Sequence, residues 1–143
     1  MKKNKIITGF TLVEMVVVIA IIGILTAVVL TAVGSARVKA RDARIISDMN
    51  QIRSFAEIKY TNANSYTGLN CSLDAPAGIL AVCDDIDVQN GGNGDDPVIN
   101  ISTDGFSYCA EGQLNDTTYY CVDNAGIVAT GAAKCATGIT SCK

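Results

Sequence analysis

The feature that most constrains this chain is an uncharged run of 22 residues from Met15 to Ala36. Seventeen of them are Ala, Val, Ile, Leu or Met, and the other five are Gly, Thr or Ser. As a helix rising about 1.5 Å per residue, the run is roughly 33 Å long, close to the roughly 30 Å hydrocarbon core of a bilayer. The rest of a 143-residue chain offers too little core to enclose such a helix. We therefore expect this run to reside in a membrane.

The residues that flank the run predict its orientation. Lys2, Lys3 and Lys5 precede it, which places the N-terminus on the cytoplasmic side and exports everything after Ala36. Four basic residues also follow the run and weaken this argument: Arg37, Lys39, Arg41 and Arg44. Asp42 and Asp48 partly balance their charge.

The periodicity beyond the run predicts that the helix continues. Ile45, Met49, Ile52 and Ala56 recur at helical spacing, with Phe55 beside them, which indicates one apolar stripe. Only Gly34 and Ser35 separate this stripe from the apolar run, and one glycine costs a helix about 1 kcal/mol. We expect a single helix from about Thr11 to Tyr60, apolar all round in residues 10–36 and amphipathic in residues 37–60.

Residues 61–143 differ in composition from the helix. They hold ten of the 13 glycines and ten acidic residues against two basic ones, for a net charge of −8. Short β-like runs at 98–102, 106–110, 117–122 and 127–130 alternate with turn signals, which predicts an antiparallel meander. A sheet this small needs a partner surface, and the stripe on the helix is the obvious one. The expected fold class is α+β, a long N-terminal helix packed on a small β head.

Composition excludes several classes of function. The chain has no His, which removes the commonest general base and the usual zinc ligands, and we expect no enzyme activity, no cofactor and no metal. Its net charge of −3 disfavours nucleic acid as a partner, since the phosphates of DNA and RNA need a basic surface.

All six cysteines lie in the segment expected to be exported, where an even number indicates disulfides: Cys71, Cys83, Cys109, Cys121, Cys135 and Cys142. Without any C-x-x-C spacing, a zinc site or a catalytic redox pair is poorly supported. Of the fifteen possible pairings we expect bonds between sequence neighbours, 71 with 83, 109 with 121, and 135 with 142.

Two further signals are faint. Residues 84–87 and 93–96 supply carboxylates for a calcium ion, but their spacing does not match an EF-hand loop, and a solvated acidic loop is favoured. Three Asn-x-Ser/Thr triplets begin at Asn70, Asn100 and Asn115, and no glycosylation site is assigned to them.

A distinctive motif lies where the leader meets the apolar run. The sequence Gly9-Phe10-Thr11-Leu12-Val13-Glu14 follows a basic leader and opens a hydrophobic helix. In this it resembles the type IV pilin family, including the pseudopilins of type II secretion. The resemblance implies that a prepilin peptidase removes residues 1–9 by cutting after Gly9, and that the new N-terminus at Phe10 is methylated. A secretory signal peptide or a plain membrane anchor is the alternative, but the apolar region of a signal peptide should span only 7–15 residues.

Glu14 has two possible roles at the entrance to the run. A carboxylate in hydrocarbon is expensive and seeks a partner, and the amine of Phe10 in a neighbouring subunit would set the axial register of a filament. Alternatively, Glu14 lies in the first helical turn near the headgroups, where the helix dipole favours it by about 0.3–1 kcal/mol. Both roles are compatible, because the membrane-stored monomer needs the second and the filament the first.

Small residues recur every four positions along the run, at Gly23, Ala27, Thr31 and Ser35. Such a stripe lets helices approach closely and suits subunit assembly, although small residues are common in any membrane helix. Many pilins carry a proline here that helps the helix to extend, whereas this chain offers only Gly23 and Gly34 for local melting.

The resemblance implies a structural subunit of a type IV pilus, held in the cytoplasmic membrane as a single-pass precursor and then polymerised into an extracellular filament. Its partners would be copies of itself, the prepilin peptidase and the pilus assembly machinery. The four basic residues after the run would pair with acidic loops of adjacent subunits or form a solvated face. A pseudopilin and an adhesive tip subunit remain the alternatives.

Overall fold

The computed structural model describes residues 9–72, 78–92, 97–132, 135 and 138–143. Backbone contacts divide the chain into two compact units, Met1–Arg37 and Val38–Lys143. Its elements are two helices, α1 (Leu12–Ala63) and α2 (Ile79–Asn90), and four strands, β1 (Val98–Ile101), β2 (Tyr108–Gln113), β3 (Tyr119–Asp123) and β4 (Val128–Gly131). The α+β fold class predicted from the sequence is confirmed.

Helix α1 is one unbroken α-helix of 52 residues, as the sequence predicted, with an end three residues later than expected. It runs through both Gly23 and Gly34 without interruption. It ends where Asn64 adopts a left-handed conformation, with φ of 52°, and donates its backbone N–H to the carbonyl of Tyr60. Asn tolerates this conformation better than most residues, so it stops a helix at little cost.

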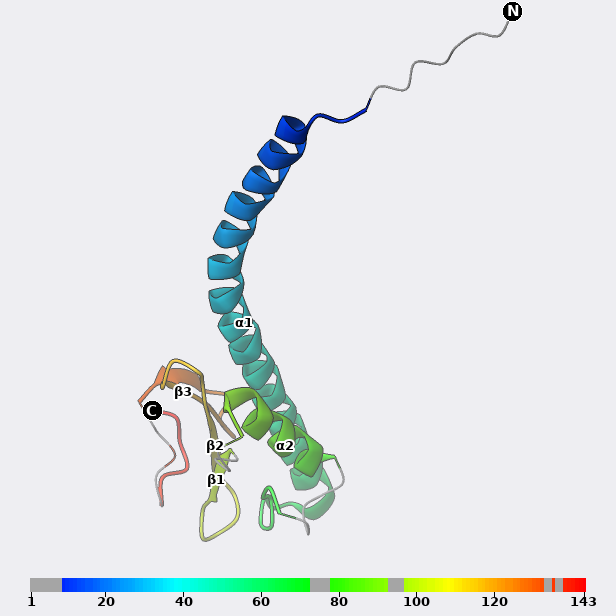
Figure 1. The fold of residues 1–143 in the computed structure, drawn as a ribbon. Helices are drawn as coiled ribbons and strands as arrows, with labels where there is room; N and C mark the ends of the chain where they lie inside the picture. Colours follow the sequence, from blue (N-terminus) through cyan, green and yellow to red (C-terminus); the bar gives the residue numbers. More distant parts are fainter. Residues whose placement is uncertain (1–8, 73–77, 93–96, 133–134, 136–137) are drawn as a thin grey trace, which may run out of the picture. The chain divides into compact units, whose positions relative to one another are not determined.

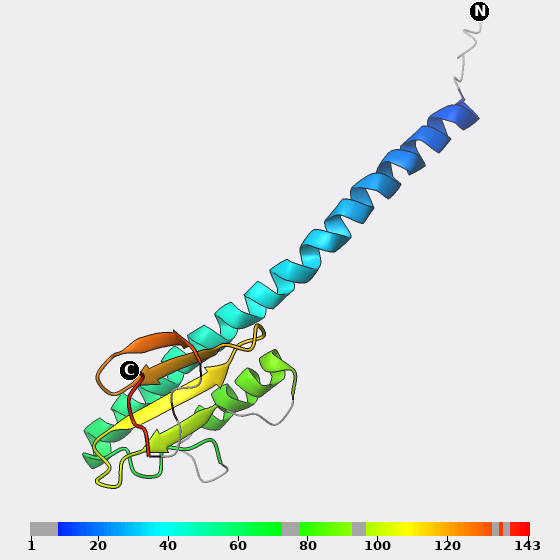
Figure 2. The ribbon, with the colours of Figure 1, turned by 90° about the vertical axis from the view of Figure 1, so that its left-hand side faces the viewer.

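The four strands form an antiparallel meander in the order β1-β2-β3-β4, as predicted. The strand ends differ from the sequence prediction by at most three residues, and the largest difference is that β2 reaches Gln113 rather than Ala110. Within Val38–Lys143, Figures 1 and 2 show the strands beside the second half of α1.

The sheet buries one face against α1. The predicted stripe is fully buried, with Ile45, Met49, Ile52 and Ala56 all at 0% exposure. It belongs to one apolar cluster with alternate residues of the two central strands, Tyr108, Ala110, Tyr120 and Val122. Because side chains alternate across a strand, the residues between them lie on the opposite face, which carries the cysteines.

Gly112 lets the sheet approach α1 closely. A Cβ atom built on Gly112 would lie 3.0 Å from Sδ and 3.4 Å from Cγ of Met49, and 3.6 Å from Cγ2 of Ile45. Glycine in a strand often marks such a close approach. The close packing of β2 on the stripe therefore requires a residue without a side chain at position 112.

Helix α2 was missed by the sequence analysis, which described residues 61–143 as a β head alone. Its buried side chains, Ile79, Cys83 and Ile86, recur at spacings of four and three and join the same apolar cluster. Glycines with positive φ bound it, Gly78 at 97° and Gly91 at 121°. Three aspartates on a 12-residue segment masked this weak periodicity. Residues 84–87 are consequently helical, so the expectation of an acidic loop there was wrong.

Candidate functional site

The N-terminus of α1 is closed by a capping box formed by Thr11 and Glu14. Oε2 of Glu14 accepts the backbone N–H of Thr11 at 2.8 Å and its hydroxyl at 2.7 Å, and the Thr11 Oγ1 accepts the backbone N–H of Glu14 at 3.3 Å. This reciprocal arrangement satisfies donors that a helix start otherwise leaves unpaired. The pattern Thr-x-x-Glu was visible in the sequence, but only the charge of Glu14 had been considered.

The first half of α1 exposes its apolar side chains. Its most apolar 18-residue window has a mean hydropathy of 3.0, and none of that window is buried. The exposed fractions reach 80% at Leu12, 68% at Ile24 and 70% at Leu30. Helix α1 is the one helix among the described residues long and apolar enough to cross a membrane. This apolar window is not packed into a core of the described chain.

The hydroxyl groups within this run are satisfied by the helix itself. Thr26 donates to the carbonyl of Ile22, Thr31 to that of Val28 and Ser35 to that of Ala32. A polar group in hydrocarbon is costly unless it is hydrogen-bonded, and these bonds remove most of that cost.

The small residues named from the sequence lie on an unbroken helix, so Gly23, Ala27 and Thr31 share one face. A Cβ atom built on Gly23 meets no atom of the described chain within 4 Å. This face is therefore open to another helix. Gly9 and Phe10 are exposed ahead of the helix, and residues 1–8 of the leader lie outside the described part.

The structure pairs all six cysteines, but not entirely as predicted. The Cys71–Cys83 bond is present as expected. The other two bonds join Cys109 to Cys135 and Cys121 to Cys142, so the predicted 109–121 and 135–142 pairs were wrong. The sequence could not show that Cys135 and Cys142 each bond to a different strand of the sheet.

Two buried carboxylates, which the sequence analysis did not single out, lie among these cysteines. Glu111 is 5% exposed and accepts the backbone N–H of Cys135 at 2.9 Å. Asp123 is 1% exposed; its Oδ1 accepts the backbone N–H groups of Ala125 and Ile127, and its Oδ2 accepts the N–H of Cys142 at 3.0 Å. The sequence feature that could have pointed to them is that each acid lies two residues after a cysteine of the same strand, Glu111 after Cys109 and Asp123 after Cys121.

A second group of charges connects the two helices. Arg44 of α1 forms a 2.5 Å ion pair with Asp85 of α2, so at least one of the four basic residues after the run pairs within its own chain. Asp48 lies beside them at 7% exposure, and Gln51 donates a hydrogen bond to its Oδ1. Burial, followed by the neighbouring Asp85, raises the pKa of Asp48 to about 6. Burial acts to raise the pKa of Asp85, but hydrogen bonds from Asp48 and Arg44 outweigh it and hold that pKa below its ordinary value.

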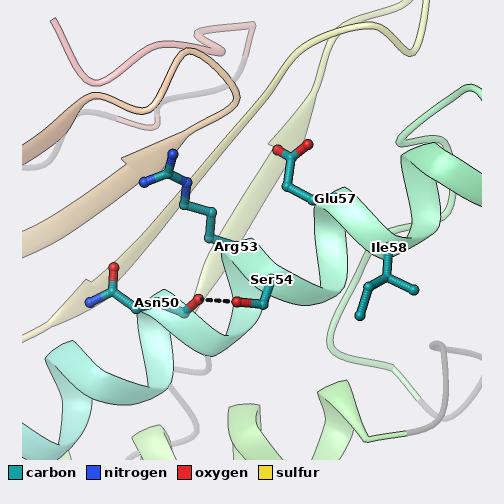
Figure 3. Close-up of a pocket in the computed structure, with 5 residues that line it drawn as sticks. All are labelled: Asn50, Arg53, Ser54, Glu57 and Ile58. Carbon is teal, nitrogen blue, oxygen red and sulfur yellow. Dashed lines mark hydrogen bonds between the residues drawn. The ribbon is translucent and has the colours of Figure 1, made fainter.

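A shallow groove of about 500 Å³ runs along the second half of α1 (Figure 3). Its lining residues are Asn50, Arg53, Ser54, Glu57 and Ile58. The hydroxyl of Ser54 donates to the carbonyl of Asn50 at 3.1 Å. Glu57 accepts the hydroxyl of Tyr66 at 3.2 Å through its Oε1. The candidate calcium ligands at 93–96 lie outside the described residues.

These features define a class of protein, an α+β head whose first helix is continuous with a single capped, apolar N-terminal helix. Comparison with known proteins identifies that class more closely. The family model described as the prokaryotic N-terminal methylation motif matches residues 5–30. The type IV wide pilus major component PilA4 of Thermus thermophilus is 40% identical over 65 residues, which cover 46% of this chain. The chain spans about half the length of that curated relative. No solved structure matches.

The chain therefore resembles type IV pilins over part of its length. The segment matched by the family model contains the whole motif from Gly9 to Glu14, on which the sequence analysis based the same resemblance.

Proposed function

We propose that this chain is a structural subunit of a type IV pilus, which polymerises through the first half of α1 into an extracellular filament. The observation that carries the proposal is the capped apolar helix whose side chains find no partner within the described chain. A membrane satisfies that surface in the precursor, and the helices of neighbouring subunits would satisfy it in the filament.

In this proposal the leader is removed after Gly9 and the amine of Phe10 becomes the N-terminus, which is then methylated. The free amine has an ordinary pKa of about 7.7–8.0 and carries a positive charge at neutral pH. Both hydrogen bonds that Thr11 donates end on Oε2 of Glu14. Oε1 therefore stays available to the Phe10 amine of a neighbouring subunit, so one carboxylate both caps its own helix and sets the filament register.

Substitutions at Glu14 and Thr11 separate the two roles. Glu14→Gln keeps a side chain that supports a capping box but removes the charge, whereas Thr11→Val removes the capping hydroxyl and keeps the charge. If the register depends on the ion pair, Glu14→Gln should be processed normally yet form few or no filaments, and Thr11→Val should still assemble. Processing is followed by the mass of the membrane-bound subunit, and filaments are counted by electron microscopy of sheared fractions.

The opposite result, normal filaments from Glu14→Gln and their loss in Thr11→Val, would leave Glu14 with a capping role alone. Normal filaments from both variants and from Glu14→Ala would overturn its role in assembly altogether.

A further inference from the structure

Two disulfides join Cys135 and Cys142 to Cys109 and Cys121 of the sheet. Their four buried sulfur atoms all lie within 4.8 Å of one another. Atoms of different bonds approach as closely as Cys109 and Cys121 at 3.3 Å, and Cys121 and Cys135 at 3.3 Å. Sγ of Cys109 also lies 4.0 Å from Sγ of Cys142. Proximity alone therefore does not select among the three ways of joining four cysteines in pairs.

The strand register places a carboxylate next to each cysteine of the sheet. Cys109 pairs across the ladder with Asp123, and Glu111 pairs with Cys121. Because side chains alternate, these four residues share one face and form a square in which each cysteine stands diagonally opposite the other. The two acids thus occupy the remaining corners of the same buried square.

Each acid holds the backbone of one C-terminal cysteine. Glu111 on β2 accepts the N–H of Cys135, whose sulfur bonds to Cys109 of the same strand. Asp123 on β3 accepts the N–H of Cys142, whose sulfur bonds to Cys121 of that strand. Ser141 also donates its hydroxyl to Asp123, at 3.4 Å. In both cases the strand that holds the backbone is the strand that receives the disulfide.

We propose that Glu111 and Asp123 are specificity-determining residues for disulfide formation, which direct Cys135 to Cys109 and Cys142 to Cys121. Hydrogen bonds to a carboxylate are stronger than neutral ones, and a buried carboxylate without them is costly. The two acids therefore favour the pairing that keeps the backbone N–H groups of Cys135 and Cys142 hydrogen-bonded to them. The proposal is independent of the role in a filament.

The chemistry is ordinary thiol–disulfide exchange. One cysteine thiolate attacks the disulfide of oxidised glutathione, which releases one glutathione and leaves a mixed disulfide. The second cysteine thiolate then attacks the mixed disulfide and releases the other glutathione, so that the two electrons and two protons lost by the protein thiols end on two reduced glutathione molecules. Rearrangement between pairings needs no net electrons: an external thiolate attacks one bond, and the cysteine released attacks the next. A glutathione redox buffer supplies both reactions.

The test is oxidative refolding of the full-length chain in detergent with reduced and oxidised glutathione, followed by non-reducing peptide mapping. Wild-type protein should recover Cys109–Cys135 and Cys121–Cys142 almost exclusively. Asp123→Asn replaces one acceptor oxygen by a donor, and Glu111→Gln removes the charge; each should raise the fraction of non-native pairs at least several-fold, Cys109–Cys121 included. Asp42→Asn is the matched control, because Asp42 also accepts a backbone N–H, from Asn115 at 2.8 Å, away from the sulfur cluster.

The Cys71–Cys83 bond reports in the same sample whether the head has folded. Native pairing at wild-type proportions in both Asp123→Asn and Glu111→Gln would overturn the proposal.

A variant that keeps three of the four clustered cysteines tests the same selection with both carboxylates intact, in case the acid variants do not fold. In Cys109→Ser, Cys121 can join Cys142 or Cys135, and both are 2% exposed. The proposal expects Cys121–Cys142 to predominate at least several-fold, and an even mixture would contradict it.

Discussion

At the scale of single residues, the most informative side chains are carboxylates, of which Asp48, Glu111 and Asp123 are buried and Glu14 is exposed. Asp48 faces Asp85 across the contact between α1 and α2, Glu111 and Asp123 hold the C-terminal segment, and Glu14 caps its own helix. The sequence marked Glu14 because a charge in an apolar run is conspicuous. It did not mark the others, because an acid on a mostly polar segment becomes unusual only once the fold buries it.

Asp48 should make the stability of the head depend on pH. Its folded-state pKa of about 6 lies above the ordinary value of 3.8, so the protonated form is stabilised by folding. That contribution is fully present below about pH 4 and is lost as the pH rises through 6, with a size of about 1–3 kcal/mol. The lowered pKa of Asp85 acts in the opposite sense, but only as the pH falls below its ordinary value of 3.8. The thermal midpoint of the tyrosine near-ultraviolet circular dichroism signal should therefore fall between pH 4.5 and 7.

Asp48→Asn resembles the protonated side chain and should remove most of this dependence, leaving a head more stable than wild type at pH 7. Asp104→Asn, which changes an exposed turn residue, should keep it. An unchanged pH profile in Asp48→Asn would show that Asp48 does not titrate in this range.

At the scale of elements, hydrophobic periodicity was sufficient for α1 and for the order of the four strands, because both present long or repeated patterns to one core. It was insufficient for α2, whose three buried residues are separated by aspartates and bounded by glycines. It was also insufficient for two disulfides, since Cys135 and Cys142 are held by contacts with distant strands, among them hydrogen bonds to Glu111 and Asp123, and by no local pattern. The pairing of the sequence neighbours Cys71 and Cys83 was predicted correctly.

The contact between β2 and α1 depends on Gly112. Gly112→Val should destabilise the head by about 1–3 kcal/mol, because its added atoms enter the space held by Met49 and Ile45. Gln113→Val is the matched control, since the next residue of the strand faces away from α1. Denaturant titration of both variants measures the difference.

Met49→Ala opens space beside position 112. The double variant Met49→Ala, Gly112→Val should therefore lose less stability than the sum of the losses in the two single variants, a non-additive result. Strict additivity of the two substitutions, or a stability of Gly112→Val equal to wild type, would contradict the close approach described for this pair.

At the scale of the whole molecule, the chain combines two surfaces with different requirements. The apolar half of α1 needs a membrane or other helices, whereas residues 61–143 carry a net charge of −8 and three disulfides that suit exposure outside the cell. The sequence predicted this division from composition alone. It left open what the apolar surface contacts after export, and the proposed answer is the same surface of other subunits.

Immunogold electron microscopy with an antibody against the head tests that proposal most directly, on intact cells and on sheared surface filaments. A structural pilus subunit should be labelled at regular intervals along the whole filament, and the label should disappear with the filaments when the gene is deleted. Label confined to the filament tip would assign the chain to a minor adhesive role. Label confined to the cell envelope, with filaments unaffected by deletion, would contradict its assembly into a pilus.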